Sequence, residues 1–545
     1  MKKFFFILFL LLITTSLCHA GCVDTFGIGA KATSLGGAFS AYADDAFAAY
    51  YNPSGLGQLE GLKISGGFHA MFLKMEIEDF KVSNTDNPNI KGPIDFTDDS
   101  SALFVPHLGV AMPIGDRLAV GLAAYVPWGL QTQWEDDPTK NPAAYNYYEG
   151  YFLREVVTPT LSYKISDKLS VGFGVSIGKS KGGEKRKVYI SPDLTTYSNI
   201  GKTAGEVVQS MFDGASKILA AGYGDPENWE KYAVTDTLTA SKIYQGAYAK
   251  TKDQKYGAYA TVLTKMSNIE GTQKPYTVSD VENYYNTTYE HRGGVAHGEK
   301  LEVNVTDDFN YSFNIGMMYK PLDTITLGLT YRSRTDVKME GDAKQDGTKV
   351  SEVTVEDWDH PDQIQAGIRY EPHDKFSIEL DIVWTNWSIN KLQKAELKTP
   401  IYINILDAND PAAIMFNKPV FISEHERNWE DTRQVRVGCE YILNEIVTLR
   451  GGYFYDPSPI PDDTMDLLWP DADKKIYSLG AGFNFGKFSI DAVVQYADVE
   501  HSRIIGGESE NVNHSYDVTE LYGREVSLKA DGNVWGVGLT FNYEL

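Results

Sequence analysis

The sequence predicts an all-β protein: a fourteen-stranded antiparallel transmembrane β-barrel with an N-terminal segment inside its lumen and a partly helical loop insertion. Three observations predict this fold class. Strand-length stretches alternate apolar and polar residues, short and long connections follow one another in succession, and the chain ends in an aromatic-rich strand. A transmembrane barrel needs no long apolar run, because its strands alternate lipid-facing and lumen-facing side chains. A mean hydropathy of −0.30 is therefore compatible with a membrane protein.

Residues 1–20 predict a signal peptide. They combine a basic start, a short apolar run and the small-x-small ending Cys18-His19-Ala20, with cleavage expected after Ala20. The apolar run is too short to span a bilayer comfortably as a helix. In an alternative reading the chain is exported in the same way and carries a lipid at Cys22, because Ala20-Gly21-Cys22 resembles the end of a lipoprotein box. His19 departs from that pattern, since it stands where an aliphatic residue is expected. No disulfide is expected between Cys22 and the distant Cys439.

Alternation with a period of two is clear in five stretches. In residues 309–319, Phe, Tyr, Ile and Met side chains share one face, and Asn, Ser and Gly share the other. The others are residues 118–126, 376–384, 433–441 and 488–496. Runs of about ten residues with this period match tilted membrane strands. A soluble β-sandwich also alternates, so the period alone does not decide between the two.

The connections decide in favour of a barrel. Six are short, and seven long polar stretches alternate with them, which gives fourteen strands. The short ones are residues 113–117, 165–168, 320–324, 371–375, 443–446 and 485–487; the long ones are roughly 75–100, 131–150, 190–303, 337–362, 393–430, 456–473 and 500–529. Outer-membrane barrels place short turns in the periplasm and long loops outside. We therefore expect the outer membrane of a Gram-negative (diderm) bacterium, with both termini in the periplasm.

The final strand also predicts how the barrel is assembled. In residues 533–545, the spacing Gly538-x-x-Phe541-x-Tyr543 resembles the C-terminal signal by which barrel strands are recognised, although two residues follow it here. The barrel-assembly machinery is therefore an expected partner during biogenesis.

Charge and motifs exclude several functions. A net charge of −24 makes nucleic acid a poor partner. The ten histidines are scattered, so no metal site is expected, and neither a nucleophile elbow nor a phosphate-binding loop is present. We therefore predict no cofactor, no catalytic residues and no enzyme activity.

Residues 21–57 precede the barrel, which we assign to residues 58–545. Glycines and alanines are frequent there, which permits close backbone packing. Asp44 and Asp45 are expected to cap a short helix that Asn52-Pro53 ends. Entering from the periplasmic side, this segment can fold back into the lumen and plug it.

At this point the chain resembles the FadL/TodX family of outer-membrane transporters for hydrophobic compounds. The stretch "GIGAKATSLGGAFSAYADDAFAAYYNPSGLG" (27–57) is similar to the N-terminal hatch of that family, with Ser54 replacing the usual Ala in the Asn-Pro-Ala-Gly-Leu motif. The resemblance continues at residues 123–134, 329–343, 382–388 and 451–461 and in the last strand; residues 190–303 are longer than expected. The hatch residues it implies are Asp44, Asp45, Asn52, Pro53, Ser54, Gly55 and Leu56.

The resemblance implies a function as well. A monomeric, hatch-plugged barrel would take up a hydrophobic small-molecule ligand, a long-chain fatty acid or a hydrocarbon, and release it sideways into outer-membrane lipid. A lateral exit needs a break in the strand ladder, which proline favours. Pro106, Pro127 and Pro159 lie in successive expected strands, and we place the opening at Pro127 and Gly129. In the alternative reading these prolines only mark strand ends.

The sequence indicates the ligand-binding residues less specifically than it indicates the hatch. Tyr125, Arg154 and Arg436 are candidates on the barrel strands, with the basic cluster 185–187 nearby, because a fatty acid needs a cation for its carboxylate. Alternatively, these cations neutralise the lumen acids Glu379, Asp381 and Glu440, and a pocket without a cation would suit a neutral hydrocarbon.

The insertion 190–303 carries apolar residues at helical spacing, Met211 and Phe212 among them. We expect amphipathic helices over the barrel mouth. Their apolar faces either form a capture groove for the ligand or pack on each other and on the lid of the barrel.

Three other functions remain open from the sequence: a general diffusion pore, a surface adhesin on a barrel, and an outer-membrane hydrolase. Conductance separates the first from a transporter, because an open pore passes salt steadily and a plugged barrel does not. An adhesin would show no uptake defect when the hatch is removed.

Overall fold

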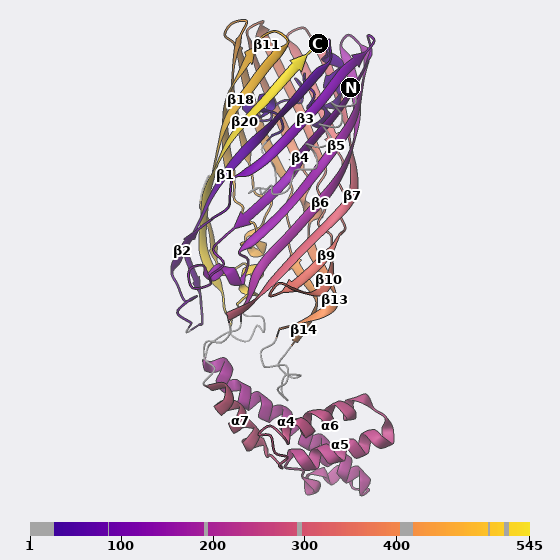
Figure 1. The fold of residues 1–545 in the computed structure, drawn as a ribbon, viewed down its shortest axis with the longest axis vertical. Helices are drawn as coiled ribbons and strands as arrows, with labels where there is room; N and C mark the ends of the chain where they lie inside the picture. The colour runs from indigo at the N-terminus through magenta and orange to yellow at the C-terminus, as the bar shows by residue number, and fades with distance from the viewer. Residues whose placement is uncertain are drawn as a thin grey trace.

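A closed barrel dominates the computed structural model, which describes residues 27–85, 87–189, 194–290, 297–403, 418–499, 502–516 and 523–545 (Figure 1). Fourteen antiparallel strands form the wall, as predicted. They are β1 (Lys63–Val82), β3 (Leu103–Ile114), β4 (Leu118–Gln133), β5 (Glu149–Ser166), β6 (Leu169–Tyr189), β7 (His297–Leu322), β8 (Ile325–Arg332), β11 (Gln363–His373), β12 (Phe376–Thr385), β15 (Thr432–Ile442), β16 (Val447–Asp456), β17 (Lys474–Asn484), β18 (Phe488–Val499) and β20 (Val526–Glu544). The expected signal peptide and Cys22 lie outside the described residues.

The wall closes where the first strand meets the last. β1 pairs with β20 from Lys63↔Glu544 to Val82↔Val526. The predicted succession of connections is confirmed, since two- to four-residue turns alternate with long loops around the barrel. Short turns and the C-terminus lie at one end, and the long loops lie at the other (Figure 1).

Six further strands extend the wall at the long-loop end, in stretches that the sequence predicted as loops. They are β2 (Ile94–Thr97), β9 (Met339–Gln345), β10 (Thr348–Glu356), β13 (Leu392–Ile403), β14 (Lys418–Glu426) and β19 (Arg503–Gly506). Short 3-10 and α elements also lie in these loops: η2 (Pro142–Tyr145), η4 (Trp387–Ile389), η5 (Asp462–Thr464) and α9 (Glu510–Asn513).

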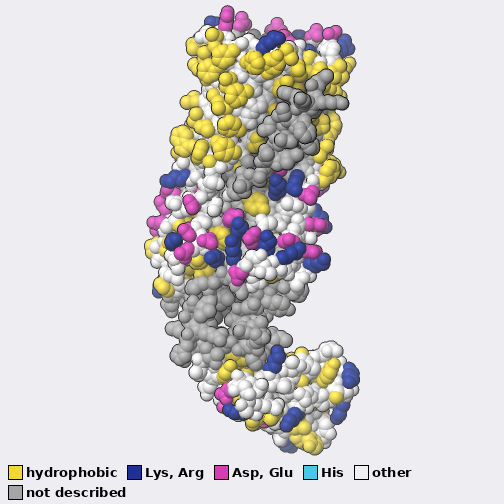
Figure 2. Space-filling model, viewed as in Figure 1, with side chains coloured by type: hydrophobic (Ala, Val, Ile, Leu, Met, Phe, Trp, Pro, Cys, Tyr) yellow, Lys and Arg dark blue, Asp and Glu magenta, His cyan; other side chains and the backbone are white. Residues whose placement is uncertain are grey.

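The outer face of the wall is apolar along a band. On β7, Phe309, Tyr311 and Ile315 are exposed, while the intervening Asn310 and Ser312 are buried in the lumen. Hydrophobic side chains gather near the short-turn end, and a belt of charged side chains follows toward the long loops (Figure 2). This arrangement confirms the predicted alternation and matches the lipid-facing band of a transmembrane barrel.

One strand departs from the predicted alternation. In residues 118–126, Leu122 faces outward and Ala123 inward as expected, but Val126 is only 6% exposed. The register with β5 shifts between Tyr125 and Trp128, so that two residues of β4 oppose one of β5. Such a bulge bends its strand and interrupts the alternation of faces.

Helices fill the insertion between β6 and β7. They are α4 (Leu194–Gly222), η3 (Pro226–Tyr232), α5 (Thr237–Thr251), α6 (Gln254–Met266) and α7 (Val278–Glu290), and they lie beyond the long-loop end (Figure 1). Their apolar side chains form a core of their own. No helix among the described residues is long and apolar enough to cross a membrane.

Candidate functional site

The N-terminal segment, residues 27–59, lies inside the barrel. It is almost entirely buried and comprises α2 (Ala30–Ser34), α3 (Ala48–Tyr51) and the 3-10 helix η1 (Pro53–Gln58). α2 contacts β16, β17, β18 and β20, and η1 contacts β5, β6 and β7, so the segment bridges opposite sides of the lumen.

Two carboxylates of β12 hold the backbone of this segment. Asp381 accepts hydrogen bonds from the N–H groups of Phe39 (3.3 Å) and Ser40 (3.1 Å), and Glu379 accepts one from Ala41 (2.7 Å). The sequence suggested that lumen cations neutralise these acids, but they accept hydrogen bonds from backbone amides of the segment and, at Asp381, from the side-chain amide of Gln365 (2.6 Å). These hydrogen bonds fasten residues 39–41 to β12.

Glycines of the wall make room for the segment. At each of them, a Cβ atom would lie within 3.0 Å of an atom of residues 27–59. These glycines are Gly109, Gly121, Gly172, Gly316, Gly328, Gly367, Gly438, Gly452 and Gly480. The glycines within the segment were predicted to allow close packing. These wall glycines were not predicted, although strand alternation places them on the inner face.

Asn52 connects the segment to itself and to the wall. Its amide donates to the carbonyls of Ser40 (2.7 Å) and Met317 (3.1 Å), and its Oδ1 accepts from the N–H of Ser54 (3.1 Å). Pro53 opens η1, Leu56 is fully buried, and a Cβ at Gly55 would lie 2.1 Å from the carbonyl of Ala43. The residues of the predicted motif therefore form one compact turn.

The predicted capping role of Asp44 and Asp45 is wrong. α3 begins at Ala48 after Phe47, without a side-chain cap. Asp45 instead accepts a hydrogen bond from Phe47 N–H (2.8 Å) in a turn before the helix, and Asp44 pairs with Lys31 (2.8 Å). Burial, together with neighbouring Asp44, raises the pKa of Asp45 to about 6.

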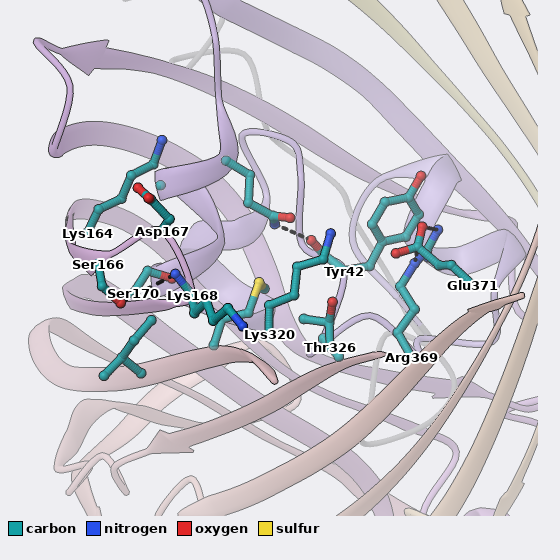
Figure 3. A pocket seen from close by; sticks show the side chains of 15 residues that line it. Tyr42, Lys164, Ser166, Asp167, Lys168, Ser170, Lys320, Thr326, Arg369 and Glu371 are labelled. Carbon is teal, nitrogen blue, oxygen red and sulfur yellow. Dashed lines mark hydrogen bonds and ion pairs between the residues drawn. The ribbon is translucent and has the colours of Figure 1, made fainter. Parts of the chain in front are cut away.

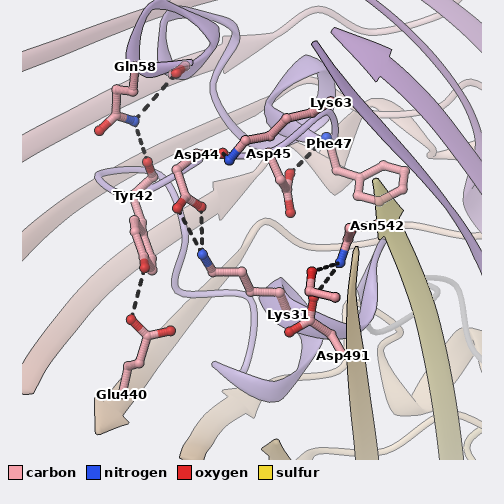
Figure 4. Close-up of polar contacts among 12 residues, drawn as sticks. Lys31, Tyr42, Asp44, Asp45, Phe47, Gln58, Lys63, Glu440, Asp491 and Asn542 are labelled. Carbon is pink, nitrogen blue, oxygen red and sulfur yellow. Dashed lines mark hydrogen bonds and ion pairs between the residues drawn. The ribbon is translucent and has the colours of Figure 1, made fainter. Parts of the chain in front are cut away.

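A buried polar network ties this pair to the wall (Figure 4). Tyr42 donates to Glu440 (2.8 Å). Arg450 pairs with both Glu440 (2.7 Å) and Asp491 (2.6 Å). Arg450 of β16 therefore links β15 and β18, and its removal would take the cation away from two buried carboxylates at once.

The ladder of backbone hydrogen bonds in the barrel wall is interrupted between β3 and β4. Their paired residues run only from Leu108↔Ala124 to Ile114↔Leu118, although β4 continues to Gln133 and stays paired with β5. Residues 103–107 of β3 pair with β1 alone, and contact with β4 returns where Asp99 N–H donates to the Gln133 carbonyl (2.8 Å). Pro127 lies in the bulge on the β4 side of this break, and Gly129 follows it.

Apolar side chains connect this break with the lumen. Leu103 and Val105 of β3 and Val126 and Leu153 beside the bulge belong to one buried cluster with inward-facing residues of other strands. These residues are Met71, Phe454, Ile476, Ala497 and Val534.

Two arginines lie near the bulge without an acidic partner. Arg154 donates to Asn310 (3.0 Å) and Ser312 (3.2 Å), and Arg332 donates to Gln363, Gln365 and the Tyr50 carbonyl. Within the described part of the chain, no carboxylate lies within 4 Å of either guanidinium. Both line a pocket of about 30 Å³ with Tyr125, Pro127, Trp128 and His360.

The remaining predicted ligand residues lie elsewhere. Arg436 donates to Gln434 (3.0 Å) and lies against the N-terminal segment, where a Cβ at Gly37 would be 2.3 Å from its Nη1. Met211 and Phe212 are buried in the core of the helical insertion, as the alternative reading expected. Arg332 was not predicted, although strand alternation places it on the inner face.

Aromatic side chains of the long loops pack against those of β4 and β5 toward the long-loop end. Trp128, Trp358, Trp387, Trp429 and Trp469 belong to one buried cluster, in which Phe152 and Trp358 stack with ring centres 4.4 Å apart. Among the described residues, no group of three or more His, Cys, Asp or Glu side chains is placed to hold a metal ion.

Comparison with known proteins agrees with this arrangement. The chain is 23% identical over 337 residues to the long-chain fatty acid transport protein of Escherichia coli O6:H1, which covers 57% of this chain and 64% of that protein. A crystal structure of a Pseudomonas aeruginosa FadL homologue matches 97% of this chain and 100% of its own, with a TM-score of 0.62 and 16% identity. The structure of the Pseudomonas putida toluene transporter TodX matches 96% of this chain and 99% of its own, with a TM-score of 0.56 and 13% identity.

The family model of the outer membrane protein transport proteins (OMPP1/FadL/TodX) matches residues 11–230 and 237–545. Because this match covers nearly the whole chain, the chain belongs to that family, the outer-membrane β-barrels that transport hydrophobic compounds.

Proposed function

We propose that this protein takes up long-chain amphiphiles with an anionic head group, such as fatty acids, with residues 21–57 acting as a hatch. One observation carries the choice of substrate: Arg154 and Arg332 line one pocket beside the bulge of β4, and both are held only by neutral oxygens. A relative that matches this chain is named a long-chain fatty acid transport protein, and a structural neighbour is named a toluene transporter.

The chemistry of the two arginines favours an anion. Burying a guanidinium without a counter-charge is costly, and hydrogen bonds to amide and hydroxyl oxygens compensate only partly. A carboxylate accepts two parallel bonds from a guanidinium, which adds both energy and orientation. The pocket volume of about 30 Å³ is enough for one small polar group of this kind.

The apolar cluster beside the bulge suits the tail of such a molecule. Each buried methylene contributes about 0.8 kcal/mol, so a long chain gains several kcal/mol by leaving water. A neighbouring pocket lined mainly by apolar groups has a volume of about 40 Å³, which is smaller than a sixteen-carbon chain. Binding therefore requires the cluster and the aromatic loops to move apart. The break between β3 and β4 then offers the tail a route into the membrane, and the hatch blocks the direct route to the periplasm.

Substituting Arg154 by methionine is expected to weaken palmitate binding to the purified barrel about 10- to 100-fold, because a hydrogen bond to a charged group contributes about 1.5–3 kcal/mol. Binding of the neutral analogue 1-hexadecanol should stay nearly unchanged. Displacement of a fluorescent fatty acid measures both. Arg433→Met, at an exposed position of β15, is the matched control. If wild type binds both compounds equally well, or if Arg154→Met weakens both equally, the substrate is a neutral compound.

Substituting Pro127 by valine is expected to slow uptake of labelled palmitate into cells several-fold, because loss of the proline favours a regular strand and a narrower break. The matched control is Pro159→Val. Pro159 lies in a regular stretch of β5, opposite Leu122, and its side chain is exposed on the outer face. Equal uptake by the two folded variants would show that the exit lies elsewhere.

A further inference from the structure

A pocket at the periplasmic mouth of the barrel is separate from the pocket beside the β4 bulge and shares no lining residue with it. We propose that it binds an acidic polypeptide segment presented from the periplasm. Its volume is about 370 Å³, and it opens at the short-turn end (Figure 3). Ala41, Tyr42, Gly57 and Gln58 of the N-terminal segment form one side, and the β5–β6 turn, the adjoining ends of β7 and β8, and β11 form the other.

Positive charge dominates the pocket. Lys164, Lys168, Lys320 and Arg369 line it, against Asp167 and Glu371. Over the described ranges, none of the three lysines has a carboxylate within 4 Å, whereas the hatch lysine Lys31 pairs with Asp44. In a chain of net charge −24, unpaired lysines gathered at one opening indicate a site for an anion.

Arg369 is buried in this pocket. Its side chain is 6% exposed, and its Nη2 lies 3.6 Å from Glu440 Oε1. The guanidinium lies over the ring of Tyr42, with its centre 3.3 Å from the ring centre, and reaches Glu371 at 3.4 Å. Because Arg369 is paired with these two carboxylates, the charge available to an anion in this pocket comes from the three lysines.

The form of the site favours several carboxylates over one compact anion. The pocket is several times larger than a phosphate ion, and its volume is in the range of ordinary ligand sites. Each lysine is a single point charge, and the three lie apart in β5, in the β5–β6 turn and in β7. Compact phosphate sites usually use arginine forks or converging backbone N–H groups instead. A segment with several acidic side chains can reach all three lysines at once.

The hatch forms part of the pocket, so binding there is linked to hatch position. Gln58 donates to the Tyr42 carbonyl (2.5 Å), and the neighbouring Ala41 N–H donates to Glu379. A ligand that touches Tyr42 and Gln58 therefore contacts the stretch by which the hatch is fastened to β12, and the coupling acts in both directions.

Titration of the purified full-length barrel with a fluorescent hexaglutamate peptide tests the proposal. The variant Lys164→Gln/Lys168→Gln/Lys320→Gln should bind it about tenfold more weakly than wild type. The matched control, Arg117→Gln/Lys375→Gln/Lys487→Gln, removes the same charge from other turns at the same end and should change the affinity less than twofold. Hexaglutamine should not bind.

Three results would overturn the proposal. Hexaglutamate could fail to bind wild type. The two triple variants could lose affinity equally, which would mean unspecific attraction to positive charge. Inorganic phosphate could displace the fluorescent peptide as effectively as the same concentration of unlabelled hexaglutamate does. This result would assign the pocket to a compact anion.

Discussion

Substituting Gly452 by valine is expected to open the barrel to ions. A Cβ on Gly452 would lie 2.1 Å from the backbone nitrogen of Gly36, and backbone atoms cannot move aside as a flexible side chain does. Gly36 has a φ of +65°, in the left-handed region that few residues other than glycine adopt, so it cannot easily take another conformation. The hatch must therefore leave its seat on β16, and the plugged lumen becomes a channel.

Single-channel conductance in a planar bilayer measures this effect. Wild type should pass little salt, and Gly452→Val should show a steady conductance. Gly451→Val is the matched control, because the neighbouring glycine faces outward and a Cβ there would make only ordinary contacts, with Leu479 at 3.8 Å and the Ser478 carbonyl at 4.0 Å. A steady wild-type conductance would favour a general diffusion pore, and a closed Gly452→Val barrel would show that the hatch does not depend on this contact.

The wall was predictable because its physics is local and periodic. Strand alternation reports which side chains face lipid, and loop lengths report which end of the barrel each connection occupies, so the fourteen strands followed without long-range information. The six extension strands were not predictable in this way. β10, for example, lies beyond the lipid band and pairs with β9 and β13. Its side chains Val353 and Val355 are buried inside and its outer face is mainly polar, so the apolar outer face that marks the lipid-facing strands is absent.

The candidate site was predictable only in part. The motif at residues 52–56 and the kink at Pro127 are sequence-local features, and the structure places each in a distinct turn or bulge. The seats of the hatch depend instead on contacts between residues hundreds of positions apart, such as Ala41 with Glu379. A single sequence carries no signal for such pairs. Arg332 differs, since its inward position follows from the alternation of β8.

Substituting Asn52 by aspartate is expected to weaken hatch docking by about 3 kcal/mol, although the two side chains have nearly the same shape. Asn52 is fully buried and uses both ends of its amide, donating to the carbonyls of Ser40 and Met317 and accepting from Ser54. A carboxylate keeps the acceptor but removes the donor, and it places negative charge against two carbonyl oxygens. Hydrogen–deuterium exchange of residues 27–59 should accelerate about a hundredfold.

Asn444→Asp is the control for this change. In its exposed turn, Asn444 accepts hydrogen bonds from the N–H groups of Ile446 and Val447 through Oδ1 (both 2.9 Å), and a carboxylate accepts them equally well. Exchange of residues 27–59 should therefore match wild type in this variant.

Measuring exchange over a range of pH separates two effects of Asn52→Asp: loss of the hydrogen-bond donor, and a general loss of packing. Burial against two carbonyls raises the pKa of the carboxyl group that the Asn52→Asp substitution introduces, so the docked state binds a proton more tightly than the released state. Docking should therefore strengthen as the pH falls, because the protonated carboxyl regains one O–H donor. After correction for intrinsic exchange, protection of residues 27–59 should rise at low pH in this variant and more than in wild type. Protection that is low at every pH would mean that the turn at residues 52–56 has lost its structure, and that the hydrogen bonds of Asn52 do not by themselves fasten the hatch.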